Sequence, residues 1–248
     1  MVSGVYWSVG SRSVNEDSLA LESVRTDRGE CTLMAVCDGI GSLDRGETVS
    51  GYVTECLVRW FYKSGIRMCD SSVKKIKRSL CKCLYDCHSE LKVTADNAGI
   101  SWGTTCTCVF LYGRRFVYVH LGDSCCYHIF RSGRTAAHAG IRRTAAHAGL
   151  KRLTQAHVNP RGELNRCLGS MRYYAPDTGS GRLRKGSGLL VASDGFTGHL
   201  SERELADSLD LGDEVTNERI ERRLAGIGAE IARRGGSDNR SAVCVLLK

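Results

Sequence analysis

Apolar residues recur at helical spacing in three stretches of the chain. In one of them Val73, Ile76 and Leu80 lie one turn apart on a single face, as in a helix that packs on a sheet. A further short helix is expected from Ser201, because Glu204 stands three residues later and completes a capping box. The three periodic helices are predicted over residues 46–64, 71–93 and 217–233.

Other stretches are rich in apolar and β-branched residues and are bounded by turn residues, as strands are. Three of them follow one another between residues 105 and 130 with short connections, which implies antiparallel pairing. Strands and helices come in runs and do not strictly alternate, so the order predicts an α+β domain built in layers. The expected strands cover residues 5–9, 19–21, 32–37, 105–111, 116–121, 125–130, 188–193 and 242–247.

Two of the buried strands end in the same dipeptide. The run at 32–37 is followed by Asp38 and Gly39, and Asp194 follows the run at 188–193, again before a glycine. An apolar strand that ends in Asp-Gly presents a carboxylate where the backbone turns sharply. Both aspartates are therefore candidates to hold a ligand at the end of a strand.

Further carboxylates stand in turns beside predicted strands. Glu16 and Asp17 lie in the polar turn before the strand at 19–21, and Asp238 precedes the last strand. A single aspartate in a turn is usually a cap or an Asx-turn. Several of them at strand ends, with glycines beside them, suit a hard cation with oxygen ligands such as Mg²⁺ or Mn²⁺.

Composition and charge narrow the class of protein. The 248 residues allow one large domain or two small ones, and a 42% hydrophobic content suffices for a packed core. The net charge is +8, but the largest basic cluster, at 74–78, lies on a predicted helix without interleaved aromatic residues. We therefore expect no nucleic-acid binding, and no apolar stretch is long enough to predict a membrane span.

Thirteen cysteines are spread along the chain. The N-terminus lacks the charged and apolar segments of a secretory signal, so we expect reduced thiols and a cytoplasmic location. The densest group, Cys81, Cys83, Cys87 and His88, lacks the spacing of a zinc knuckle and lies in a helical pattern. This context favours structural thiols.

Residues 134–142 and 143–151 are tandem copies that differ only by Ile/Leu and Arg/Lys exchanges. Two copies are too few for a solenoid, and a glycine interrupts each of them. We expect a duplicated surface loop that lengthens a hairpin. A metal or anion site at His138 and His147 is the less favoured interpretation.

Eight short motifs follow one another between residues 12 and 243. They are Arg12-x3-Glu16-Asp17-Ser18, Val36-Cys37-Asp38-Gly39-Ile40-Gly41 with Gly46-Glu47, Gly103-Thr104-Thr105, Gly122-Asp123-Ser124, Leu153-Thr154, Leu168-Gly169, Ser193-Asp194-Gly195 and Asp238-Asn239-x-Ser241-Ala242-Val243. In this order they resemble the PPM/PP2C family of metal-dependent protein serine/threonine phosphatases, of the bacterial type. Because the series covers nearly the whole chain, it indicates one domain over residues 1–248.

The resemblance implies an α+β fold of four αββα layers, in which two antiparallel β-sheets are flanked by helices. It also implies two Mn²⁺ or Mg²⁺ ions in a cleft at one end. The duplicated loop at 134–151 stands where the family has a tight hairpin, and the flap at 157–168 is shorter than in many bacterial members. A short flap makes fewer substrate contacts, so we expect peptide specificity to lie elsewhere.

The same resemblance assigns the metal ligands by motif position. Asp38 would bridge both ions, and the carbonyl oxygen of Gly39 would bind one of them. A glycine is expected there because a side chain would crowd the ions. Asp194 and Asp238 would hold the first ion.

The remaining roles fall on the loop near residue 12 and on two supporting residues. Glu16 and Asp17 would serve the second ion, directly or through water. Arg12 would bind the substrate phosphate, because a guanidinium matches paired phosphate oxygens, and Asp123 and Asn239 would support the site without contacting the ions. Two metals about 3.5–4 Å apart supply a bridging hydroxide for in-line attack, so Arg12 and the bridging aspartate are the predicted catalytic residues.

Two positions depart from the family pattern. The family usually has Leu-Thr-x-Asp-His, whose aspartate ligates a third, weakly held metal, and here Ala156 occupies that position. Without this ligand, reduced activity or an altered metal requirement is expected. Ile40 stands where eukaryotic members carry a histidine proposed as general acid, and His157 is interpreted as structural, so the general acid is unassigned.

The resemblance implies a protein phosphatase that hydrolyses phosphoserine and phosphothreonine. Its partners would be phosphorylated proteins, with a Ser/Thr kinase or its targets among them. Two alternatives stay open: a catalytically weak regulatory module that binds phosphoproteins, for which Ala156 is the argument, and a small-molecule phosphomonoesterase. Retention of Arg12, Asp38, Asp194 and Asp238 favours the enzyme.

Overall fold

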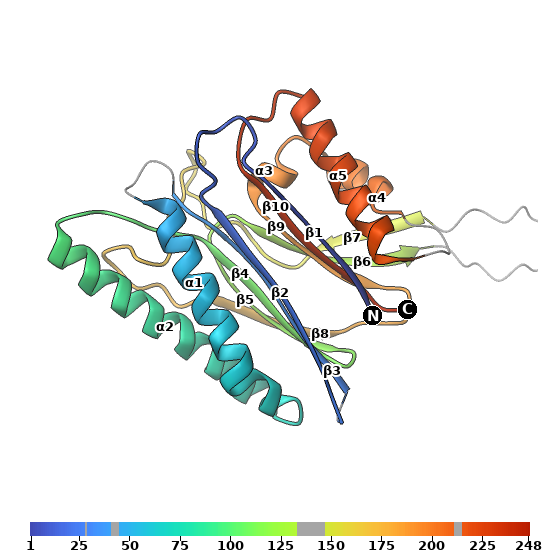
Figure 1. Ribbon diagram of the computed structural model, residues 1–248, viewed down its shortest axis with the longest axis horizontal. Coiled ribbons are helices and arrows are strands. Elements are labelled where there is room, and N and C mark those ends of the chain that lie inside the picture. Colours follow the sequence, from blue (N-terminus) through green and yellow to red (C-terminus); the bar gives the residue numbers. More distant parts are fainter. Residues whose placement is uncertain (28, 41–44, 133–146, 211–214) are drawn as a thin grey trace, which may run out of the picture.

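The computed structural model describes residues 1–27, 29–40, 45–132, 147–210 and 215–248, which form two antiparallel sheets of five strands each (Figure 1). Sheet I has the order β1 (Val2–Ser8), β10 (Arg240–Leu246), β9 (Gly188–Ala192), β6 (Cys125–Ser132) and β7 (His147–Arg152). Sheet II has the order β2 (Asp17–Thr26), β3 (Gly29–Asp38), β4 (Cys106–Tyr112), β5 (Arg115–Leu121) and β8 (Asp177–Arg182).

Helices cover the outer face of each sheet (Figure 1). The elements on sheet II are α1 (Gly46–Trp60), the π-helical turn η1 (Phe61–Gly65), the 3-10 turn η2 (Ile66–Met68) and α2 (Val73–Ala98). Those on sheet I are α3 (Asp194–Thr197), α4 (Glu202–Ser208) and α5 (Asn217–Arg233). The layers are thus helix, sheet, sheet and helix, and the predicted αββα sandwich is confirmed.

The strand β3 supplies side chains to two cores at once. Leu33 and Ala35 belong to the cluster under α1 and α2, whereas Met34 and Val36 belong to the cluster between the sheets. A strand that is buried on both faces has a continuous apolar sequence without polar alternation. This double burial explains the uninterrupted run that precedes Asp38.

Most predicted elements are confirmed, and the differences have local reasons. The helix expected over 46–64 is α-helical to Trp60 and continues as the π-helical turn. The pattern does not predict β8, which is polar and glycine-rich, or α3, which has four residues. Capping at Ser201 is confirmed, because its side chain and that of Glu204 both make the capping-box hydrogen bonds.

The duplicated segment is described only in part. A loop was expected here, but the last residues of the segment belong to β7. This strand pairs antiparallel with β6, and the pairing begins with Ser132 opposite His147. This pairing corrects the loop interpretation for the end of the second copy, because the neighbouring edge of β6 offers it hydrogen bonds. Residues 133–146, with His138, lie outside the described residues.

One pair of cysteines departs from the expectation of reduced thiols. Cys31 in β3 and Cys69 just after η2 form a disulfide, whereas the other cysteines are free. The expectation is wrong for this pair because the connection between α1 and α2 returns to the outer face of β3 and brings the two sulfur atoms together.

Candidate active site

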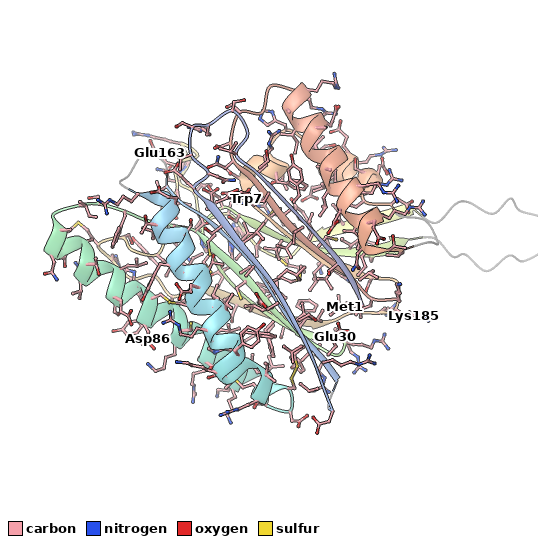
Figure 2. The ribbon with its side chains drawn as sticks, in the orientation of Figure 1. Met1, Trp7, Glu30, Asp86, Glu163 and Lys185 are labelled. Carbon is pink, nitrogen blue, oxygen red and sulfur yellow. A yellow bond between two sulfur atoms is a disulfide. The ribbon has the colours of Figure 1, made fainter. Side chains whose placement is uncertain are left out.

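Strands of both sheets bring four aspartates to one end of the sandwich. Asp17 begins β2 and Asp38 ends β3, and the two residues pair in register. Asp194 begins α3 directly after β9, and Asp123 lies in the turn between β5 and β6. Trp7, labelled in Figure 2, lies at this end, and its indole Nε1 donates to the main-chain oxygen of Asp17 at 3.0 Å.

The four side chains influence one another electrostatically. Burial raises the pKa of Asp38 well above its usual range, and the negative charges of Asp17, Asp194 and Asp123 raise it further. Burial also raises the pKa of Asp17, to about 6, and that of Asp123. A cation placed among these carboxylates would offset their repulsion and favour their charged forms.

The donor set fits a hard cation. Asp17 is 2% exposed, and its Oδ2 accepts a hydrogen bond from Ser193 Oγ at 2.9 Å, but its Oδ1 is buried without a partner. Such an unpaired oxygen is costly unless a ligand satisfies it, and carboxylate oxygens are the ligands that Mg²⁺ and Mn²⁺ prefer. As the side chains stand, no three His, Cys, Asp or Glu residues of the described chain are arranged to hold a metal ion. The fit therefore rests on donor chemistry and on the unpaired oxygen.

Two threonines hold the backbone at Asp38. The Asp38 N–H donates to Thr105 Oγ1 at 3.0 Å, and Thr104 Oγ1 donates to the Asp38 carbonyl oxygen at 2.9 Å. The hydroxyls of Thr105 and Ser124 also hydrogen-bond at 2.8 Å. The Gly-Thr-Thr motif thus links Asp38 to the turn that carries Asp123.

Close approach of α1 explains the glycine that follows Asp38. A Cβ on Gly39 would lie 2.4 Å from the carbonyl oxygen of Gly46, and a Cβ on Gly46 would lie 2.6 Å from Glu16 Oε1. The α1 backbone thus occupies the space that a side chain at position 39 would need. This reason for a glycine differs from the predicted one, which was the crowding of metal ions. Burial and then the charge of Glu47 raise the pKa of Glu16.

Asn239 fastens the loop between β1 and β2. Its side chain is buried; Nδ2 donates to the carbonyl oxygens of Val9 at 2.8 Å and Val14 at 3.1 Å, and Oδ1 accepts from the Glu16 N–H at 2.8 Å. These bonds hold both ends of the loop that carries Arg12. The predicted supporting residue thus positions a loop, not a single ligand.

Arg12 and Asp238 form an ion pair at the exposed rim. Arg12 Nε lies 3.2 Å from Asp238 Oδ1, and the two side chains are 56% and 50% exposed. An exposed pair of this kind contributes at most about 1 kcal/mol. Arg12 can therefore reorient toward an incoming phosphate at little cost.

His157 holds the turn that carries Asp123. The main-chain N–H of His157 donates to the Gly122 carbonyl oxygen at 2.8 Å, and the ring atom Nδ1 accepts from the main-chain N–H of Gly122 at 3.0 Å. The ring proton is therefore on Nε2, which lies 3.1 Å from Asp177 Oδ2. Arg166 of the short flap lies 3.6 Å from the other oxygen of Asp177. These contacts agree with a structural role for the histidine.

The roles of two serines of the site were not predicted from the sequence. Ser193 donates to Asp17, as described above, and Ser50 of α1 donates to the Glu16 carbonyl oxygen at 2.6 Å. The signal for Ser193 is its place before Asp194 in a recognised motif. The signal for Ser50 is weaker, since it is only a polar residue on the buried face of a helix.

The sequence model of the protein phosphatase 2C family matches residues 9–227. The chain belongs to this family, as the order of its motifs indicates. The prediction of a protein phosphatase is thus confirmed at the level of the family. No curated protein sequence matches the chain.

Several solved structures have a fold similar to that of this chain. Serine/threonine phosphatase Stp1 from Staphylococcus aureus has a TM-score of 0.79 at 20% identity, over 100% of this chain and 96% of that one. PppA, a key regulatory component of T6SS in Pseudomonas aeruginosa, has 0.72 at 24% identity, over 98% and 96%. The catalytic domain of serine threonine protein phosphatase PstP, in complex with two manganese ions, has 0.73 at 20%, over 99% and 98%. At these identities the likeness establishes the fold.

Proposed function

We propose that the chain is a Mn²⁺- or Mg²⁺-dependent phosphatase that hydrolyses phosphoserine and phosphothreonine in proteins. The observation that carries the proposal is the pair of Asp17, which is buried, and Asp38, which is partly exposed, beside Asp123 and Asp194, with one oxygen of Asp17 unpaired. Membership of the protein phosphatase 2C family and the two manganese ions of the PstP catalytic domain support a binuclear site.

Each proposed ligand comes from a motif position. All of them lie at or beside the end of the sandwich that carries Asp17, Asp38, Asp123 and Asp194, which we call the carboxylate end. When bound, the ions supply a nucleophile derived from water at neutral pH and positive charge that faces the phosphoryl oxygens. The proposed ligands are Asp38 between the ions, the Gly39 carbonyl oxygen, Asp194 and Asp238 at the first ion, and Glu16 and Asp17 at the second.

The chain itself orients the substrate. Arg12 offers a fork of N–H donors to the phosphate, and Asn239 keeps its loop in place. Asp238 pairs with Arg12 in the free protein and keeps the guanidinium at the rim. Arg12 would thus hold the phosphate at the rim, next to the proposed metal ligand Asp238.

One observation favours a second function. Ala156 removes the carboxylate that the family uses for a third metal, so a slow enzyme that mainly binds phosphoproteins is the second candidate. In both cases the partners are phosphorylated proteins, including a Ser/Thr kinase or its targets, and the proposed location is the cytoplasm. None of the helices in the described ranges is long and apolar enough to cross a membrane.

Hydrolysis of p-nitrophenyl phosphate and of a phosphothreonine peptide, measured over a Mn²⁺ titration, tests the proposal. We expect hydrolysis of both by the natural chain and of neither by Asp38→Ala. Asp86→Ala is the matched control, because this half-exposed carboxylate on α2 pairs with Lys82 at 2.9 Å, away from the proposed site, and its loss should leave both rates unchanged.

The hydrolysis assay, combined with calorimetry of Mn²⁺ binding, separates the alternative functions. Mn²⁺ binding seen by calorimetry without hydrolysis of either substrate would support the binding module. Hydrolysis of the small ester without hydrolysis of phosphopeptides would support the small-molecule phosphomonoesterase.

A further inference from the structure

A groove between α1 and α2 is lined with thiols. Its volume is about 350 Å³, and its lining includes Cys56 of α1 and Cys83 and Cys87 of α2. Asp86, labelled in Figure 2, also lines it. Cys56 stands ten residues after Gly46, or about 15 Å along α1 from the carboxylate end. The groove is thus separate from the proposed catalytic site.

Contacts among the three thiols make them chemically unequal. The S–H of Cys83 donates to the Cys56 main-chain oxygen at 3.7 Å, and the Cys87 thiol interacts with the thiols of both Cys56 and Cys83. The interaction with Cys87 is the main cause that lowers the pKa of Cys56 to about 7; Tyr52 and the charge of Arg59 act in the same direction, whereas burial and Glu90 oppose it. The same contact raises the pKa of Cys87, which keeps its proton.

Exposure also distinguishes Cys56 from Cys87. Cys56 is partly exposed, whereas Cys87 is 3% exposed. A small reagent from solution therefore reaches Cys56 first.

We propose that Cys56 is a site of oxidation by hydrogen peroxide and that Cys87 converts the product to a disulfide between α1 and α2. In the first step the Cys56 thiolate attacks one peroxide oxygen, the O–O bond breaks, hydroxide leaves and a sulfenic acid remains. In the second step the Cys87 sulfur attacks the Cys56 sulfur, the S–O bond breaks and water leaves with the Cys87 proton. Two electrons pass from the two thiols to the peroxide.

Helix geometry disfavours a disulfide between Cys83 and Cys87, so the partner of Cys87 is Cys56 on the other helix. Cys83 and Cys87 stand four residues apart in α2, so their Cβ atoms are about 5–6 Å apart. A disulfide requires Cβ atoms about 3.8 Å apart. Cys87 is also the thiol with the largest effect on the Cys56 thiol, whereas the S–H of Cys83 donates to the Cys56 backbone.

Alkylation of the full chain by iodoacetamide at pH 7 tests the first step. Cys56 should react at least about threefold faster than an ordinary thiol, because its larger thiolate fraction outweighs its lower intrinsic nucleophilicity. Cys81 is the matched comparison within the chain, since it is also partly exposed and burial raises its pKa. Equal rates at Cys56 and Cys81 would overturn the proposal.

Peptide mapping after one equivalent of hydrogen peroxide tests the second step. Cys56 lies in the tryptic peptide 46–59 and Cys87 in 83–92, and cleavage before Asp86 separates Cys87 from Cys83. We expect a Cys56–Cys87 crosslink in the natural chain, so this result does not depend on how a variant folds. A crosslink through Cys83, or no crosslink to Cys56, contradicts the proposal.

Single substitutions assign the roles. Cys87→Ser should leave a sulfenic acid on Cys56 that dimedone labels, and Cys83→Ser should form the same crosslink as the natural chain. Dimedone label on other cysteines but not on Cys56 would refute the assignment. Because no phosphatase assay is used, the outcome is independent of the proposed activity.

Discussion

Two groups of carboxylates in this molecule have opposite electrostatic surroundings. At the end of the sheets, burial and neighbouring carboxylates raise the pKa of Asp38. Between α4 and α5, Arg234 contacts the carboxylates of Glu204 at 2.8 Å and Glu230 at 2.7 Å. Hydrogen bonds from Arg234 to Glu204, and from Arg233 and Arg234 to Glu230, lower the pKa of each glutamate to about 2.

The difference separates a structural group from a functional one. The exposed glutamates of α4 and α5 have their cations in the chain, so folding completes the pairs. The aspartates at the end of the sheets raise one another's pKa values, and the proposed metal ions would relieve this repulsion. Groups with pKa values perturbed in this way are typical of functional sites.

The largest effect is expected from Asp38→Asn. Loss of partners outside a metal shell already costs 10–100-fold, so removal of the central ligand should lower Mn²⁺-dependent turnover more than about 100-fold. In differential scanning fluorimetry, Mn²⁺ at 100 times its Kd should stabilise the natural chain by about 2.7 kcal/mol but not this variant. Without metal, the variant should unfold at the same or a higher temperature, because a repelling charge is gone.

Arg234→Ala is the control from the other side of the comparison. It should lower stability by less than about 1 kcal/mol and leave turnover unchanged, because its ion pairs are exposed. Metal stabilisation that survives in Asp38→Asn, or turnover that is lost in Arg234→Ala, would break the comparison.

Asn239→Ala should have the next largest effect. It leaves buried polar groups of the β1–β2 loop unpaired, which costs about 1–3 kcal/mol. The KM for a phosphopeptide should rise roughly tenfold, since 1.4 kcal/mol is a factor of ten and Arg12 loses its fixed place. Asn159→Ala, in the flap, is the control and should change KM little. Steady-state kinetics check both, and a KM unchanged in Asn239→Ala would contradict the role.

The pH dependence of stability should show the sign of the repulsion at Asp17. In metal-free protein its carboxyl titrates at about 6, against 3.8 for the ordinary group. Between these values the folded chain keeps a proton that the unfolded chain has released, so stability falls as pH rises and the loss is complete above about pH 6. Urea unfolding in EDTA at pH 4.5 and 7 should show a smaller fall for Asp17→Asn than for the natural chain, and an equal fall would refute this account.

Ala156→Asp should have the smallest effect. A carboxylate at this position restores the ligand that the family uses for a third metal, so turnover with Mn²⁺ should rise a few-fold. Ala156→Asn has a similar size without the charge and should not raise it. Turnover by Ala156→Asp that equals that of the natural chain over the full Mn²⁺ titration would contradict this prediction.

Much of the fold could be predicted because its signals are local. The helix 217–233 has the predicted bounds, since both its periodicity and its capping residue Thr216 lie in adjacent sequence. The strand β8 could not be predicted, because its polar, glycine-rich sequence becomes a strand only by pairing with β5. The site candidates Asp17, Asp38 and Asp194 likewise came from short motifs, whereas the partners that hold them are distant in the chain.

By itself the sequence determined most of the helices and strands, the family and the residues that are candidates for the metal ligands. Only the tertiary structure decided that Ser193 donates to Asp17, 176 residues away, and that Asn239 holds Glu16, 223 residues away. It also decided that Cys56 and Cys87 line the same groove, although the sequence groups Cys87 with Cys81 and Cys83. The physical reason is that periodicity and motifs act between neighbours along the chain, whereas charge, burial and hydrogen bonding act between neighbours in space.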